Sequence, residues 1–254
     1  MSTYKTQAII LRENDYINAD RLFYVYTQNY GKVILMVKGG KKIQSKLTPH
    51  LQNFSIVNLL IAKGKTFDRL ASSQILHYYQ DIKNNFEKIA IAYNFLELVD
   101  KSTHVYHPDE KIFNLLVENL EALNDNRLDI IQLKNLSNFF TIRFLNILGY
   151  SLQLYNCLYC KKKIESNENY FYPRKGSIAC SKCLPTKSDR IIKISDDAIK
   201  VLRMVILENP QKLIKIKIDS KLSIELEKLI TEFTKFHLDS QIKSKEFIAQ
   251  TINP

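Results

Sequence analysis

Four cysteines are the residues whose spacing most clearly predicts chemistry. They form two CxxC pairs, Cys157 with Cys160 and Cys180 with Cys183, and nineteen residues separate the pairs. One CxxC pair can present two thiolates to a metal ion, and two pairs complete a tetrahedral S4 shell that suits Zn²⁺. Because four thiolates leave no open coordination position, the spacing predicts one structural Zn²⁺.

Other uses of these cysteines are less well matched by the sequence. Disulfides are rare in a reducing cytoplasm. A thioredoxin-like redox role would need one CxxC beside a βαβ unit. A zinc deaminase would need an H-x-E motif and an open metal position, and the sequence has no such motif.

A second pattern is a basic stretch with no acidic residue, from Gly31 to Lys46. A glycine turn at residues 39–40 can bring backbone N–H groups and lysine ammonium groups onto phosphates. The neighbouring Asp20 could instead place Arg21 in a structural ion pair. We predict phosphate contacts on DNA from six side chains: Arg21, Lys32, Lys38, Lys41, Lys42 and Lys46.

Aromatic side chains accompany this basic stretch and could stack on unpaired bases. Because successive strand residues face opposite sides, about half of these aromatics must belong to the core, and the sequence does not say which half. They are Tyr24, Tyr26, Tyr30 and Phe54.

Two further motifs predict no site. Gly64-Lys65-Thr66 imitates the end of a phosphate-binding P-loop, but Leu59 stands where the upstream glycine is required, so we expect a hairpin turn. His104 and His107 have ligand-like spacing without an obvious third ligand. A helix start near Pro108 is the simpler explanation of that pair.

The first 80 residues have the pattern of a small β-barrel. β-Branched and aromatic runs alternate with turn signals. Five short strands in this length favour the OB-fold, a five-stranded barrel that binds nucleic acids. The expected strands are residues 4–11, 21–27, 32–38, 54–62 and 67–78.

Helical periodicity begins near Asp81, and residues 150–190 interrupt it. Pro108 suits the first position of a second helix, Gly149 suits the end of a third, and Ser195 suits an N-cap. We therefore predict an α+β multidomain protein, with a helical domain into which a zinc-binding module is inserted. The expected domains are 1–80 (OB-fold), 81–150 (helical, first part), 151–190 (zinc module) and 191–254 (helical, second part).

The charge of the chain suggests a polyanionic partner. The 254 residues have a formal net charge of +11. Residues 1–80 contain 11 basic and 4 acidic side chains, and residues 151–190 contain 8 and 3. This clustering favours nucleic acid over a compositional bias spread evenly along the chain. The sequence has no signal-peptide pattern and no apolar run long enough to span a bilayer, so we expect a cytoplasmic protein without a membrane partner.

The order of these motifs resembles the RecO family of bacterial recombination mediators. Four positions depart from the family pattern: Gly40 replaces an alanine, Leu152 a proline, and Lys161 and Ser177 replace glycines. The departures leave the four cysteines unchanged. The resemblance covers residues 6–11, 19–22, 30–32, 38–42, 45–47, 51–54, 148–150, the two CxxC pairs with Phe171 and Gly176, and residues 242–244 and 247–248.

The resemblance implies both a fold and a function. It implies an N-terminal OB-fold, a helical domain and an embedded zinc module. It also implies binding of single- and double-stranded DNA, annealing of complementary strands, partnership with RecR and the single-stranded DNA-binding protein, and help in loading RecA, at the nucleoid. None of these activities requires an enzyme. Two alternatives stay open: a protein-interaction scaffold with incidental DNA binding, and a zinc-dependent nucleic-acid enzyme.

Overall fold

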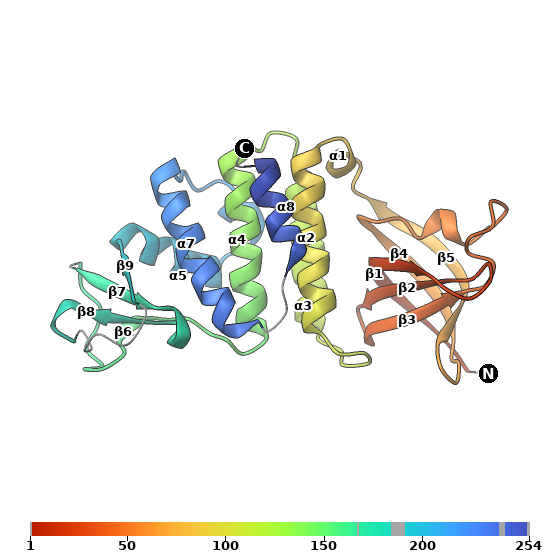
Figure 1. Cartoon of the computed structure of the whole chain (residues 1–254), viewed down its shortest axis with the longest axis horizontal. Helices are drawn as coiled ribbons and strands as arrows, with labels where there is room; N and C mark the ends of the chain where they lie inside the picture. The colour runs from red at the N-terminus through yellow and green to blue at the C-terminus, as the bar shows by residue number, and fades with distance from the viewer. Residues whose placement is uncertain (1, 167, 184–190, 239–241, 253–254) are drawn as a thin grey trace. The chain divides into compact units, whose positions relative to one another are not determined.

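The computed structural model describes residues 2–166, 168–183, 191–238 and 242–252. It has a mixed α+β architecture, with a β-rich N-terminal region followed by a mainly helical region (Figure 1). The chain divides into two compact units, residues 1–126 with 242–254, and residues 127–241. This division differs from the four domains expected from the sequence, and that finer partition stays a prediction. The end of the expected zinc module, residues 184–190, lies outside the described residues.

The N-terminal strands close into a barrel with the order β1-β2-β3-β5-β4. All neighbouring strands are antiparallel except β3 and β5. The five expected strands are confirmed, and β1 is longer than predicted because a bulge between Ile10 and Arg12 lets it continue along β2. The strands are β1 (Thr3–Asp15), β2 (Arg21–Thr27), β3 (Gly31–Val37), β4 (Ser55–Ala62) and β5 (Asp68–Tyr78).

The barrel core follows the two-residue period of its strands. In β3, alternate residues from Gly31 to Val37 are buried, and the same alternation runs through β4. Phe23, Val25 and Leu35 are fully buried inside the barrel. Four connections join the strands: residues 16–20, 28–30, 38–54 and 63–67.

Helices complete the first unit: α1 (Gln80–Lys83), α2 (Phe86–Ser102), α3 (Glu110–Leu123) and α8 (Lys243–Ile252). Asp109 caps α3 by accepting the Lys111 N–H, so the expected start at Pro108 is corrected by two residues. Helix α8 was not predicted from the sequence. The Glu97 carboxylate on α2 accepts the N–H groups of Lys243 and Ser244, at 3.1 and 2.7 Å, and so caps this helix from a distant part of the chain.

The second unit joins helices to a small sheet of order β6-β8-β7-β9. Asp129 caps α4 in a capping box with Gln132, and Ser195 caps α5 as predicted. Gly149 ends the third predicted helix in a left-handed conformation, with φ +96°. The elements are α4 (Ile130–Ile147), β6 (Gln153–Cys157), β7 (Asn169–Tyr172), β8 (Ser177–Cys180), β9 (Ile192–Ile194), α5 (Asp196–Leu207), α6 (Pro210–Leu213) and α7 (Ser220–His237).

One core serves both the sheet and the helices of the second unit. Leu154 and Phe171 from the sheet are buried in the same cluster as Phe139 of α4, Leu202 of α5 and Phe233 of α7. The strands are only three to five residues long, too short for the sequence to show a clear period. They therefore escaped the sequence analysis.

Candidate functional site

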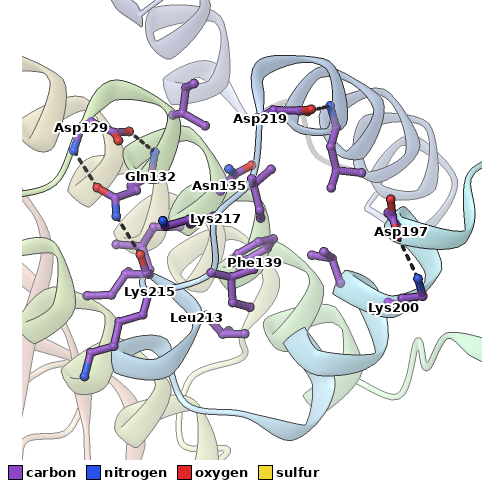
Figure 2. A pocket seen from close by; sticks show the side chains of 17 residues that line it. Asp129, Gln132, Asn135, Phe139, Asp197, Lys200, Leu213, Lys215, Lys217 and Asp219 are labelled. Carbon is purple, nitrogen blue, oxygen red and sulfur yellow. Dashed lines mark hydrogen bonds and ion pairs between the residues drawn. The ribbon is translucent and has the colours of Figure 1, made fainter.

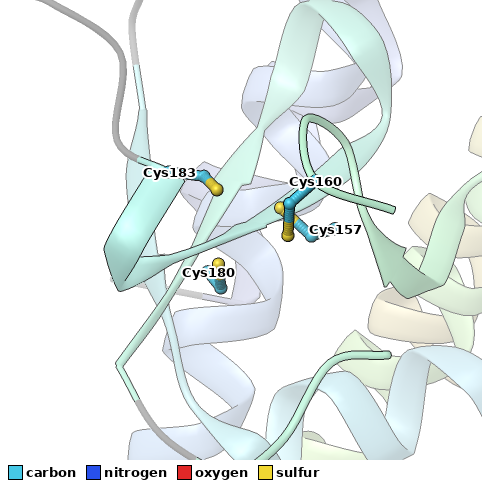
Figure 3. Close-up of side chains that lie close together, drawn as sticks. All are labelled: Cys157, Cys160, Cys180 and Cys183. Carbon is cyan, nitrogen blue, oxygen red and sulfur yellow. The ribbon is translucent and has the colours of Figure 1, made fainter. Parts of the chain in front are cut away.

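The four cysteines converge at one end of the small sheet (Figure 3). Cys157 ends β6 and Cys180 ends β8, while Cys160 lies in the turn after β6 and Cys183 ends the short 3-10 helix after β8. Their four Sγ atoms all lie within 4.8 Å of one another, and all four thiols are free of disulfides. The site could therefore hold a metal ion.

Backbone hydrogen bonds shape the first cysteine turn. The Leu158 N–H donates to the Ile178 carbonyl at 2.7 Å, which ties this turn to β8. The Cys157 N–H donates to the Lys162 carbonyl at 2.8 Å and closes the turn on itself. Lys161 has a left-handed backbone, with φ +61°, at the position where the family pattern has glycine. Its side chain contributes a hydrogen bond to the Leu158 carbonyl at 2.8 Å.

The pKa values of the clustered thiols are consistent with a cation bound between them. Burial opposes ionisation of Cys157, but N–H groups of Cys180, Cys160 and Tyr159 lower the pKa of this thiol to about 6. Hydrogen bonding to the Cys160 and Cys180 sulfurs raises the pKa of Cys183 to about 12. Four neighbouring thiols cannot all ionise without a compensating positive charge. A tetrahedral shell with Zn–S bonds of about 2.3 Å has S–S edges of about 3.8 Å, which the observed cluster accommodates.

Three of the predicted DNA-contacting lysines are exposed on the connection that follows β3. Lys38, Lys42 and Lys46 form no ion pair within the described part of the chain. Lys41 is half-buried, and its ammonium group donates to the Tyr16 carbonyl at 2.9 Å. The structure therefore brings a cluster of available positive charges to this connection, with Lys41 as its anchor.

Arg21 and Lys32 have carboxylate partners instead. The Arg21 guanidinium contacts Glu13 and Asp15, each at 3.2 Å, whereas Asp20 accepts the Gly39 N–H at 2.8 Å. The structural ion pair suggested for Arg21 is therefore present, but its partners are Glu13 and Asp15 instead of Asp20.

Lys32 lies in a partly buried charge network on the outside of the barrel. Its side chain is 12% exposed, and its ammonium donates to the backbone carbonyl of Asp100 and contacts the Asp100 carboxylate at 3.4 Å. Arg12 contacts the same carboxylate at 2.6 Å and packs on the Tyr24 ring. The sequence offered no signal for this partnership because Asp100 lies 68 residues from Lys32. DNA contact by Lys32 and Arg21 stays a prediction. Their carboxylate partners already compensate both positive charges and so make them less available to phosphates.

The aromatic candidates divide into two pairs. Tyr26 and Phe54 are fully buried and cannot stack on bases. Tyr24 packs against Arg12, and Tyr30 packs against Tyr4 with ring centroids 4.3 Å apart. Only Tyr24 and Tyr30 keep partly exposed rings.

The two motifs set aside in the sequence analysis form no site. Residues 63–67 join β4 to β5, so the GKT sequence is a strand-to-strand turn, as expected. The rings of His104 and His107 pack edge to face at 5.8 Å. Among the described residues, the four cysteines form the only cluster of at least three His, Cys, Asp or Glu side chains close enough to share a metal ion.

A groove of about 730 Å³ lies on the second unit, between α4, residues 213–219 and the start of α7 (Figure 2). Phe139 and Leu213 contribute to its apolar lining. Several of its polar groups serve the fold: Gln132 donates to the Ile214 carbonyl at 2.8 Å, and Asp197 pairs with Lys200 at 2.9 Å. We find no nucleophile paired with a base among its lining side chains.

The described residues include no helix long and apolar enough to cross a membrane. Residues 1–79 match the family described as "Recombination protein O N terminal", and residues 83–246 match "Recombination protein O C terminal". The proteins named "DNA repair protein RecO" from Dehalococcoides mccartyi strain 195 and Thermoanaerobacter sp. strain X514 are 30% and 25% identical to this chain. The alignments cover 95% and 98% of this chain and 93% and 98% of the relatives. The chain therefore belongs to the RecO family of DNA repair proteins.

Proposed function

We propose that the protein binds single- and double-stranded DNA and anneals complementary strands during repair and homologous recombination. The observation that carries this proposal is the connection after β3, where Lys38, Lys42 and Lys46 are exposed and form no ion pair with any residue that the structure describes. The closed barrel has the strand order β1-β2-β3-β5-β4, which supports assignment as an OB-fold. Barrels of that class bind oligonucleotides.

Annealing requires positioning of the strands and no covalent chemistry. Two strands repel each other through their phosphates, and lysine side chains that displace counterions from both strands reduce this repulsion. Base pairing then supplies the favourable free energy. The proposed role therefore needs neither a nucleophile nor ATP.

We also propose that Zn²⁺ fills the four-cysteine site as a structural ion. Cys157, Cys160, Cys180 and Cys183 would hold it and leave no coordination position for substrate. The ion would neutralise the thiolates and fasten the two cysteine turns to each other.

Partners of the protein follow from its family. Membership in the RecO family supports RecR and the single-stranded DNA-binding protein as direct partners and RecA as an indirect one. The protein would help RecA load onto DNA covered by the single-stranded DNA-binding protein. This role places it in the cytoplasm, at the nucleoid.

The test follows duplex formation from two complementary strands coated with the cognate single-stranded DNA-binding protein, without ATP, across a salt series. We expect fast annealing that slows as salt increases. The variant K38Q/K42Q/K46Q should slow it, whereas K217Q/K221Q/K228Q, which removes three exposed lysines of the second unit, should not. DNA binding without annealing would reduce the protein to a loading adaptor, and absence of DNA binding would refute the proposal.

A further inference from the structure

The connection between β4 and β5 is a second basic segment, which the sequence analysis treated as a plain turn. We propose that it is a preformed arm of the DNA-binding surface, with Lys63, Lys65 and Arg69 contacting phosphates. This inference rests on the proposed function, because it adds residues to the same surface.

The loop is held in a defined shape by groups beneath it. The Gly64 N–H donates to the Asp68 carboxylate at 3.0 Å, and the Lys63 N–H donates to the Ser2 carbonyl at 3.0 Å. A Cβ atom at Gly64 would lie only 1.9 Å from the Phe67 carbonyl oxygen, so this close turn requires glycine. The flanking lysines are thus presented on a fixed backbone.

Asp68 acts as the internal anchor of this turn. Asp68 is only 3% exposed, and its carboxylate also accepts a hydrogen bond from the Tyr4 hydroxyl at 2.5 Å. Burial and a hydrogen bond to the same carboxylate raise the pKa of Tyr106 to about 12, so this hydroxyl also keeps its proton. The negative charge of Asp68 is therefore satisfied internally and is not presented to solvent.

The β4–β5 loop adjoins the segments that present the other basic residues. The Phe67 ring packs edge to face against Tyr16 of the β1–β2 loop, with centroids 5.6 Å apart. That loop in turn holds the connection after β3, because the Lys41 N–H donates to the Ala19 carbonyl at 2.9 Å. Arg69 also pairs with Met36 across the parallel β3–β5 contact, two residues before Lys38. Lys38 directly follows the last residue of β3, so Arg69 lies close to the start of the connection that carries the other lysines.

The acidic residues of these three segments already accept backbone hydrogen bonds. Residues 16–20, 38–54 and 63–69 contain two acidic residues, Asp20 and Asp68. One accepts the Gly39 N–H and the other accepts the Gly64 N–H. Lys63, Lys65 and Arg69 are exposed and have no ion pair in the part of the chain that the structure describes. A polyanion could therefore approach this surface without meeting an exposed carboxylate on these three segments.

A fixed turn with free cations suits phosphate recognition. A preorganised loop loses little conformational entropy when it binds. Each phosphate that a cation neutralises releases counterions, and for a single strand it adds about 0.7 to the slope of log affinity against log salt. Three such contacts would therefore contribute about 2 to that slope.

The test measures binding of a fluorescent oligothymidine by anisotropy between low and moderate salt. We expect K63Q/K65Q/R69Q to weaken binding about tenfold or more at low salt and to reduce the salt slope by about 2. The matched variant K217Q/K221Q/K228Q removes three exposed lysines of the other unit and should bind like wild type. Thermal unfolding of all variants checks that the exposed substitutions leave the fold intact.

The outcomes separate this inference from the proposed function. If K38Q/K42Q/K46Q weakens binding but K63Q/K65Q/R69Q keeps the wild-type affinity and slope, the β4–β5 arm is refuted and the proposed function stands. Wild-type protein that fails to bind the oligonucleotide refutes both. Equal weakening by K217Q/K221Q/K228Q would also refute the arm, because the effect would then follow from net charge alone.

Discussion

The barrel loops and the cysteine cluster arrange their polar groups differently. The barrel loops leave positive charges exposed to solvent, whereas the cysteine cluster brings its thiols together. In the barrel loops, Asp20 and the nearly buried Asp68 accept backbone N–H groups, and Asp100 of α2 contacts Lys32. Cationic groups such as Lys42 remain outside. In the cysteine cluster the reactive groups themselves converge, with four sulfurs within 4.8 Å, and the neighbouring lysines stay in solvent.

This contrast separates a binding surface from a structural centre. A surface that recognises a polyanion needs unpaired positive charges on a rigid support. In a metal centre, the ligand side chains coordinate the ion and are not available to another partner. Substitutions in the cysteine cluster should therefore change stability more than the salt dependence of DNA binding. Substitutions of the exposed lysines should do the reverse, and the following predictions test that division.

The largest effect is expected for Cys160→Ser. Loss of one thiolate should lower zinc content and destabilise the second unit by roughly 3 kcal/mol or more, because metal binding supplies folding free energy. Zinc analysis of the purified protein and denaturant unfolding would measure both. A variant that keeps one zinc per chain and full stability would show that the four-sulfur site is wrong.

The next effect concerns the charge network around Asp100. Asp100→Asn leaves Lys32 and Arg12 without their carboxylate, and the first of these is nearly buried. We expect a loss of about 2–4 kcal/mol in the free energy of unfolding. Lys32→Met should also lower stability, but it should change DNA affinity of the folded protein less than twofold. A large loss of affinity without loss of stability would instead support DNA contact by Lys32.

A smaller and opposite effect is expected for Lys161→Gly. The left-handed backbone at this position disfavours a side chain. Glycine should therefore stabilise the zinc-bound protein by about 0.5–1 kcal/mol, even after loss of the hydrogen bond to the Leu158 carbonyl. Thermal unfolding at saturating zinc measures this change, and Lys162→Gly is the control. Destabilisation by Lys161→Gly would mean that the side-chain contact outweighs the backbone strain.

The smallest effect concerns pH and Glu97, which caps α8. Burial opposes ionisation of this carboxyl, but hydrogen bonds from Lys101, Ser244 and Lys243 lower its pKa. The unfolded state therefore binds the proton more tightly, and the stabilisation is present above the unfolded pKa of about 4.3. It is lost as pH falls through the lower folded pKa. Wild-type stability should thus fall more steeply in acid than that of Glu97→Gln, and parallel pH profiles would exclude the role.

The sequence by itself determined the features that depend on local patterns. The five barrel strands follow from β-branched runs between turn signals, the caps at Ser195 and Gly149 follow from residue type, and the cysteine cluster follows from two CxxC pairs. Each is decided by residues close together in the chain, whose conformational preferences or ligand spacing are visible without a structure.

Only the tertiary structure decided which charges are free. Lys32 and Lys42 look alike in the sequence, but one meets Asp100 and the other meets solvent. Contacts between distant residues also decided two other features. Glu97 caps α8, and the nearly buried Asp68 carboxylate, which also binds Tyr4, holds the turn at Gly64. The availability of a charge depends on burial and on partners that folding brings from distant positions, and a linear pattern does not encode those distances.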